Sequence, residues 1–188
     1  MESRDGTMNT HDENGKDYAE LPEYIREIME AGGGIEDIRL DADGNWFHNG
    51  ESFVNERIID FFNRSVDVTR DGTFVLRYAG FIYPITVEDA PVFVSGIIVK
   101  GFGVFEQVVL QLSLGTEERL APHTLFYREK SGLYCYVREG KLLAKFRRSP
   151  SFQLLERLEE SEDTFYISIC GEKIVLTEKT GGDQGEGD

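Results

Sequence analysis

The sequence predicts an α+β protein with a duplicated hairpin-helix-hairpin motif, in which most strands are antiparallel and each repeat has one short helix, preceded by an N-terminal helix. Three observations lead to this fold class. β-Branched and aromatic residues cluster between glycines and prolines, which favours strands. Two short stretches repeat apolar residues every three or four positions, as core-facing helices do. The two halves of the chain also match each other locally, which indicates an internal repeat.

The middle of the chain carries the residues that form a core, whereas both ends are acidic and polar. Of the 188 residues, 40% are hydrophobic, and they concentrate away from the ends. We expect a disordered leader over 1–20 and a disordered tail over 178–188. The first α+β repeat, with its lead-in helix, is expected over 21–100 and the second over 101–177, either on one shared core or as two lobes.

The first repeat opens with the lead-in helix over 21–31, which Pro22 starts and three consecutive glycines end. A hairpin is expected next, around Asp43-Gly44, because this pair adopts the positive φ angles of a tight turn. Ser52 is the expected N-terminal cap of the helix that follows.

This capped helix is expected to run to about Arg64. Its apolar face is formed by residues at helical spacing, with Val54, Ile58 and Phe61 at its centre. Asp71-Gly72 then turns the chain into three consecutive strands rich in β-branched and aromatic residues.

The second repeat is expected to follow the same order. A turn at 130–132 makes its hairpin, and Ser149-Pro150 has the form of a helix start. The apolar stripe of this helix is expected to consist of Phe152, Leu155 and Leu158.

The clearest internal match aligns the segment 71–80 with the segment 162–171. Both contain Thr-Phe followed by a glycine at the same spacing. A second match places 44–47 over 132–135. Since repeated units bury one another's apolar faces, an ancient duplication predicts a cleft or a pseudo-symmetric seam between the two copies.

The formal net charge of −15 opposes binding to polyanions. Docking on a phosphate backbone requires Lys and Arg to displace counterions, so neither nucleic acid nor an anionic membrane is an expected partner. No stretch of the sequence is apolar enough for a membrane span, and the first residues lack the pattern of an export signal. The expected location is therefore the cytoplasm.

Three segments resemble the bacterial proteins of the domain-of-unknown-function family 1285 (DUF1285). They are GIEDIRLDADGNWFHNGESFVNERIIDFF, the pentapeptide Val87–Pro91 and REGKLLAKFRRSPSFQLLERL. The resemblance implies an α+β fold with repeated motifs and, for function, only a link to signal transduction. It implies no catalytic residue. The sequence departs from the family pattern at Ser52, at Asn55 and in its last strand, so a ligand read by those groups is not implied here.

The residue types that commonly hold metals or act as nucleophiles are scattered. Cys135 and Cys170 each lie in an apolar run and are expected to be buried thiols. His11, His48 and His123 show no spacing typical of a metal site or a catalytic triad. We therefore expect no cofactor and no metal.

The adjacent carboxylates Glu88 and Asp89 form a candidate acidic site at a strand end. Such a pair can bind a cation, or each carboxylate can shift the pKa of the other. The alternative is structural, since Asp before a proline turn often accepts backbone hydrogen bonds.

The charge distribution supplies the main functional hypothesis. Residues 119–148 contain eight basic and two acidic residues, whereas the rest of the chain contains 12 basic and 33 acidic residues. A helix start beside guanidinium groups suits phosphate or carboxylate. The candidate ligand-binding residues are Arg138, Lys145, Arg147, Arg148 and Ser149. The alternative is that these side chains pair with acidic residues of the same molecule or of a second copy.

Three functions follow from these features. The first is a non-enzymatic regulatory protein that binds a small anion or a protein partner. The second is a hydrolase that uses carboxylates such as Glu88 and Asp89 near the seam between the repeats. The third is a protein-interaction scaffold. Because no catalytic constellation is visible, the sequence favours the first, and it specifies no oligomeric state.

Overall fold

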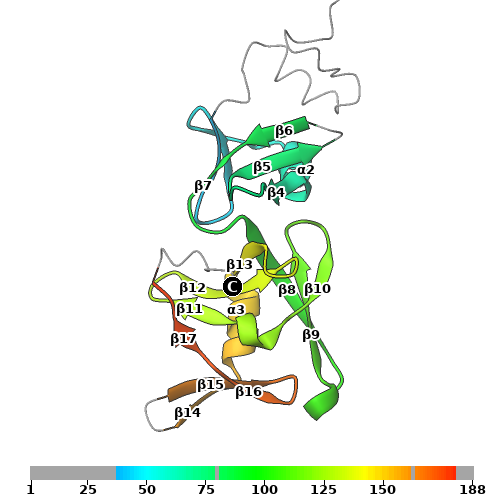
Figure 1. Ribbon diagram of the computed structural model, residues 1–188, viewed down its shortest axis with the longest axis vertical. Coiled ribbons are helices and arrows are strands. Elements are labelled where there is room, and N and C mark those ends of the chain that lie inside the picture. Colours follow the sequence, from blue (N-terminus) through cyan, green and yellow to red (C-terminus); the bar gives the residue numbers. More distant parts are fainter. Residues whose placement is uncertain (1–36, 79–80, 162–163, 181–188) are drawn as a thin grey trace, which may run out of the picture.

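The computed structural model describes residues 37–78, 81–161 and 164–180. Figure 1 shows these residues as two lobes that follow one another along the long axis. The elements of the first lobe are β1 (Ile38–Leu40), β2 (Trp46–His48), β3 (Glu51–Ser52), α2 (Glu56–Ser65), β4 (Val66–Val68), β5 (Phe74–Tyr78), β6 (Phe81–Pro84) and β7 (Thr86–Val87).

The second lobe begins with the long strand β8, which leads away from the first lobe (Figure 1). Its elements are β8 (Val92–Lys100), η2 (Gly103–Phe105), β9 (Gln107–Leu112), β10 (Glu117–Arg119), η3 (Pro122–Thr124), β11 (Phe126–Arg128), β12 (Gly132–Val137), β13 (Leu142–Phe146), α3 (Arg148–Leu155), β14 (Leu158–Ser161), β15 (Thr164–Ile169), β16 (Glu172–Val175) and β17 (Thr177–Glu178). The two η elements are single 3₁₀ turns.

The described residues form a mostly β fold, so the predicted α+β class is wrong. Strands account for 50% of these residues and lie in four sheets, and α2 and α3 are the two α-helices of this part of the chain. The helices span only 10 and 8 residues, so the sheets carry most of the apolar burial. The lead-in helix expected over 21–31 lies outside the described residues. None of the described helices is long and apolar enough to cross a membrane.

The first lobe places α2 beside two small sheets. One sheet has the order β3-β2-β1-β7 and the other the order β4-β5-β6. The expected hairpin joins β1 and β2, but its loop spans residues 41–45, and of the pair Asp43-Gly44 only Gly44 has a positive φ, +87°. The Asp41 carboxylate closes this loop by accepting hydrogen bonds from the backbone N–H groups of Asp43 and Asn45.

The N-terminal cap of α2 differs from the expectation. The side chain of Asn55, not of Ser52, accepts a hydrogen bond from the Arg57 N–H at 3.0 Å. Ser52 still belongs to β3, so the helix starts later than expected and Val54 lies exposed before it. The buried residues of the apolar face of α2 are therefore Ile58 and Phe62.

In the second lobe, seven strands form one sheet with the order β10-β9-β8-β13-β12-β11-β17. The remaining strands form the separate sheet β14-β15-β16. Helix α3 begins at Arg148 without a side-chain cap and ends at Leu155. Its buried side chains include Leu154, whereas Phe152 is exposed and Leu158 lies in β14, so the expected stripe of Phe152, Leu155 and Leu158 is wrong.

The two lobes share one order of strand pairing. In each lobe, three consecutive antiparallel strands precede a helix: β1, β2 and β3 precede α2, and β11, β12 and β13 precede α3. Three more antiparallel strands follow the helix, β4–β6 in the first lobe and β14–β16 in the second. A final short strand then pairs in parallel with the first strand, as β7 does with β1 and β17 with β11. The Ile85 N–H donates to the Phe74 carbonyl at 3.0 Å, and the Leu176 N–H donates to the Phe165 carbonyl at 2.9 Å. Phe74 and Phe165 are thus equivalent positions.

The lobes also share one core. Buried residues of β1, β2 and α2 form a continuous apolar cluster with buried residues of β8, β9, β12 and β13. Trp46, which is 1% exposed, lies at the centre of the first-lobe part, with its ring 5.2 Å from that of Phe62. Its indole N–H donates to the side-chain oxygen of Asn63 at 2.9 Å, so the buried ring also has its polar partner.

Replacing Phe62 by Ala is expected to destabilise the protein by about 3–5 kcal/mol, because the change removes a buried ring and leaves a cavity. The matched control is Phe152→Ala on α3, whose side chain is exposed and whose loss is expected to cost less than about 1 kcal/mol. Urea unfolding followed by circular dichroism measures both free energies. Equal losses in the two variants would contradict the packing described for α2.

Candidate functional site

The carboxylate of Asp89 lies where the chain passes from the first lobe to the second. One oxygen accepts a hydrogen bond from Arg128 Nη1 at 2.9 Å. The other accepts from Lys145 Nζ at 2.8 Å and from the Tyr134 hydroxyl at 2.6 Å. The Asp89 side chain is only 13% exposed, so a nearly buried carboxylate is neutralised and fully hydrogen-bonded by the second lobe.

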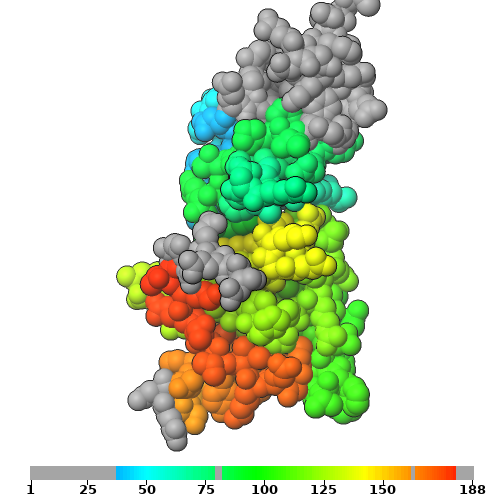
Figure 2. All heavy atoms as spheres, in the orientation of Figure 1, coloured from blue at the N-terminus to red at the C-terminus, as the bar shows by residue number. Residues whose placement is uncertain are grey.

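The neighbouring carboxylate, Glu88, points to the first lobe instead. It forms an ion pair with Arg39 of β1 and accepts a hydrogen bond from the Ala42 N–H at 3.3 Å. Lys145 adds a link across the joint, because its ammonium group also donates to the Ala42 carbonyl at 2.8 Å. The adjacent acidic residues therefore tie the two lobes to their connecting segment. Figure 2 shows the first lobe in contact with the yellow β12–β13 segment of the second.

Aromatic rings cover this ion-pair cluster. The Arg128 guanidinium lies 4.8 Å from the ring centroid of Tyr134, and that ring stacks on Phe126 at 5.5 Å. Burial raises the pKa of the Tyr134 phenol, and the Asp89 carboxylate raises it further. Tyr134 therefore stays protonated at neutral pH and acts as a hydrogen-bond donor rather than as a base.

A groove lies along the joint beside this cluster, with a volume of about 670 Å³. Its lining carries charges of both signs, including Asp43, Glu88, Asp89, Arg128, Lys130, Lys145, Glu178 and Lys179. Because acidic and basic side chains line it in nearly equal number, this groove has no single charge preference.

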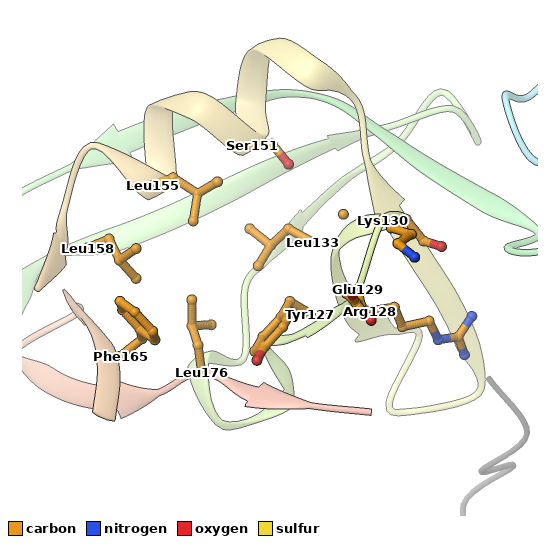
Figure 3. Close-up of a pocket in the computed structure, with 12 residues that line it drawn as sticks. Tyr127, Arg128, Glu129, Lys130, Leu133, Ser151, Leu155, Leu158, Phe165 and Leu176 are labelled. Carbon is orange, nitrogen blue, oxygen red and sulfur yellow. The ribbon is translucent and has the colours of Figure 1, made fainter. Parts of the chain in front are cut away.

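A second cavity, the apolar pocket, lies between α3, the β11–β12 hairpin and β15. Its volume is about 620 Å³, and its lining is Tyr127, Arg128, Glu129, Lys130, Ser131, Gly132, Leu133, Ser151, Leu155, Leu158, Phe165 and Leu176. Figure 3 shows Leu133, Leu155 and Phe165 directed toward a common space, with Lys130 at the end away from Phe165. The turn 128–131 lines both this pocket and the joint groove.

The pocket exists because the two helices pack differently. In the first lobe, α2 packs on β5 and its aromatic side chains fill the space between the two small sheets. In the second lobe, α3 packs mainly on β8 and β13. The space between α3 and β15 is thus left open, and Phe165 is 44% exposed there while the equivalent Phe74 packs against the core.

Comparison with known proteins identifies the fold. No protein-family model and no curated protein matches the sequence. Among solved structures, a DUF1285 family protein from Silicibacter pomeroyi superposes with a TM-score of 0.60 at 21% identity, over 74% of this chain and 79% of that chain. A DUF1285 family protein from Shewanella baltica has a TM-score of 0.49 at 17% identity, over 63% of this chain and 90% of that one.

The chain has the DUF1285 fold. The resemblance indicated by the three sequence segments is therefore confirmed at the level of the fold. In this fold the predicted site residues lie apart from one another, in different surroundings. Of the candidate ligand-binding residues, Lys145 lines the joint groove together with the acidic pair Glu88 and Asp89, and it is engaged in an ion pair with Asp89.

The other candidate ligand-binding residues line neither cavity. Arg147 and Arg148 lie over the rings of Phe93 and Phe152, at 5.4 and 5.5 Å from the ring centroids, and they are exposed together with Ser149. Arg138 lies at the β12–β13 turn, where its backbone N–H donates to the Glu118 carboxylate at 2.9 and 3.0 Å. An anion site at Arg147, Arg148 and Ser149 stays a prediction.

Sequence reasoning missed the apolar pocket. Leu155, Leu158 and Phe165 were recognised only as members of a helical stripe or of the internal match. The sequence carries no local signal for this pocket, because the space depends on α3 packing on β8 and β13. The cysteines add no chemistry: burial raises the pKa of the Cys135 thiol to about 12, and Cys170 is half-buried. No metal-binding cluster occurs among the residues that the structure describes.

Changing Asp89 to Asn is expected to lower the free energy of unfolding by about 3 kcal/mol, because it leaves Arg128 and Lys145 without their shared counter-charge in a nearly buried position. The matched control is Glu88→Gln, which breaks a more exposed ion pair and is expected to cost no more than about 1 kcal/mol. Chemical denaturation measures both. If Asn at position 89 were tolerated as well as Gln at position 88, the joint would not depend on this ion-pair cluster.

Proposed function

We propose that this protein is a non-enzymatic, regulatory ligand-binding protein whose ligand is a small anion with an apolar body, held in the apolar pocket. The observation that carries the proposal is the pocket itself: six large side chains with apolar surface surround it, and a lysine lies at one end. Its volume of about 620 Å³ lies within the range of small-molecule sites. These six side chains belong to Tyr127, Leu133, Leu155, Leu158, Phe165 and Leu176.

The polar groups of the pocket suit a negatively charged end. Lys130 makes no ion pair with any residue in the described part of the chain, in contrast to Arg128 and Lys145, which share Asp89. Ser151 adds a hydroxyl to the lining. Because Arg128 is paired with Asp89, Lys130 is the lining cation that a carboxylate or phosphate would meet.

The hydrolase alternative has weaker support. A general base needs a free carboxylate oxygen in reach of a substrate. Both oxygens of Asp89 already accept hydrogen bonds from basic or phenolic groups, and Glu88 is held by Arg39 and the Ala42 N–H. The acidic pair is thus occupied in joining the lobes, which favours binding over catalysis.

The test is a chain-length series of straight-chain carboxylates, each with its matched alcohol, in calorimetric titration and thermal unfolding. Affinity is expected to rise about fourfold for each added methylene until the pocket is full, because burying one CH₂ contributes about 0.8 kcal/mol. A ligand at about 100 times its dissociation constant raises stability by about 2.7 kcal/mol, which corresponds to several degrees in the unfolding midpoint. Sulfate serves as the control for nonspecific anion effects.

Variants assign the site within the same experiment. Lys130→Ala is expected to weaken the carboxylates and leave the alcohols unchanged, whereas Leu155→Trp, which fills the pocket, is expected to weaken both. The control is the double variant Arg147→Ala with Arg148→Ala, at exposed positions that line neither cavity. Binding that is lost only in this double variant would move the site to the start of α3, and an absence of binding across the series would contradict the proposed function.

A further inference from the structure

The apolar pocket and the joint groove meet at one hairpin turn. The four consecutive residues 128–131 line both cavities, and the other lining residues belong to one cavity each. Figure 3 shows Lys130 at the end of the apolar pocket away from Phe165, on the side toward which the Arg128 side chain extends. A ligand whose apolar body fills the pocket and whose polar end meets Lys130 therefore has that end beside the joint groove.

Most charged side chains of the joint groove have partners within the protein. Arg128 and Lys145 both bind Asp89, at 2.9 and 2.8 Å. The ammonium group of Lys145 also donates to a backbone carbonyl of the first lobe. Glu88 forms its ion pair with Arg39. These groups hold the lobes together, and a ligand that used them would have to break the joint.

The two charged groove residues at the end of β17 are engaged as well. The Lys179 ammonium lies 4.8 Å from the ring centroid of Phe126 and 5.6 Å from that of Tyr136. The Glu178 carboxylate accepts a hydrogen bond from the Tyr127 hydroxyl at 3.4 Å. Contacts of the chain itself therefore compensate both charges.

Three charged side chains of the joint groove remain, those of Asp43, Glu129 and Lys130. All three are exposed, and none makes an ion pair or a side-chain hydrogen bond with another residue of the described part of the chain. Asp43 lies in the β1–β2 loop of the first lobe, whereas Glu129 and Lys130 lie in the β11–β12 turn of the second. One ammonium group and two carboxylates are thus available to the head of a ligand at the joint.

The lining of the groove also indicates which cation suits the two carboxylates. Among the described residues, no aromatic side chain lines the groove. Quaternary ammonium groups are recognised by the faces of aromatic rings, whereas a primary ammonium group donates up to three hydrogen bonds, and carboxylates are its strongest acceptors. Asp43 and Glu129 therefore suit a primary ammonium group.

Building on the proposed function, we infer that the ligand of the apolar pocket is a zwitterionic amphiphile. Its anionic group meets Lys130 at the end of the apolar body, and a primary ammonium group beyond it reaches Asp43 and Glu129 in the joint groove. The ammonium group also offsets the repulsion that the net charge of −15 exerts on a plain anion. Acylated diamino acids and single-chain ethanolamine phospholipids both carry such a head and differ in the anion, carboxylate or phosphate.

The test compares matched probes by calorimetric titration of the full chain below their micelle concentrations. N-Decanoyl-lysine is expected to bind about threefold to tenfold more tightly than N-decanoyl-norleucine, which lacks only the amine. Decylphosphoethanolamine is expected to exceed decylphosphocholine by a similar factor, because trimethylation removes the hydrogen-bond donors. A gain in either pair supports the inference, and the pair with the larger gain identifies the anion at Lys130.

Variants locate the ammonium group. The double variant Asp43→Asn with Glu129→Gln is expected to abolish the gain. The matched control is Glu51→Gln with Glu172→Gln, which removes two exposed carboxylates, one on each lobe, that line neither cavity. This control is expected to keep the gain, and both double variants are expected to bind decanoate equally because they lose the same charge. Their unfolding midpoints are expected to stay near that of the wild type, since every changed side chain is exposed.

Decanoate separates this inference from the proposed function. If decanoate binds but neither amine-bearing probe binds more tightly than its matched control, the zwitterionic ligand is ruled out while the apolar pocket remains a binding site. A gain that survives in the Asp43→Asn, Glu129→Gln variant would also overturn the inference, since the ammonium group would then lie elsewhere. If none of the probes binds, the proposed function is contradicted and the inference fails with it.

Discussion

The two adjacent carboxylates of Glu88 and Asp89 bind opposite lobes, and the arrangement of the molecule depends on this division. Asp89 is nearly buried, and three side chains of β11, β12 and β13 complete its hydrogen bonding. Glu88 turns back to β1. Since an unpaired charge at the position of Asp89 would be costly, the connecting segment has one favourable placement on the second lobe. The shared apolar core then fixes the first lobe against it.

Within that frame, the placement of one helix decides where a ligand can enter. The two lobes repeat the same strand pairing, and Phe74 and Phe165 occupy equivalent positions. In the first lobe, α2 covers β5, and the rings of Phe61 and Phe62 fill the interior. In the second lobe, the additional strand β8 pairs with β13, and α3 packs on these two strands instead. The position that a helix closes in one lobe is consequently an open pocket in the other.

Local features of the fold were predictable from the sequence, and long-range ones were not. Gly44 adopts the positive φ that places a hairpin loop here, and the Thr-Phe match gives the correct equivalence of Phe74 and Phe165. The fold class was wrong because the strands are short and the two helices end after a few turns, so periodicity overstated the helical share. The ion pair of Lys145 with Asp89 joins residues far apart in the chain, and only the pairing of β13 with β8 brings them together. The apolar pocket depends in the same way on where α3 packs.

The fold also explains part of the charge asymmetry in the sequence. Two of the eight basic residues of 119–148, Arg128 and Lys145, are used internally at Asp89. The second lobe, which carries the apolar pocket, is neutral as a whole. The first lobe is acidic, and its interior is filled. An anionic ligand that enters the pocket of the neutral lobe avoids the repulsion that the net charge of the acidic first lobe would exert on it at close range.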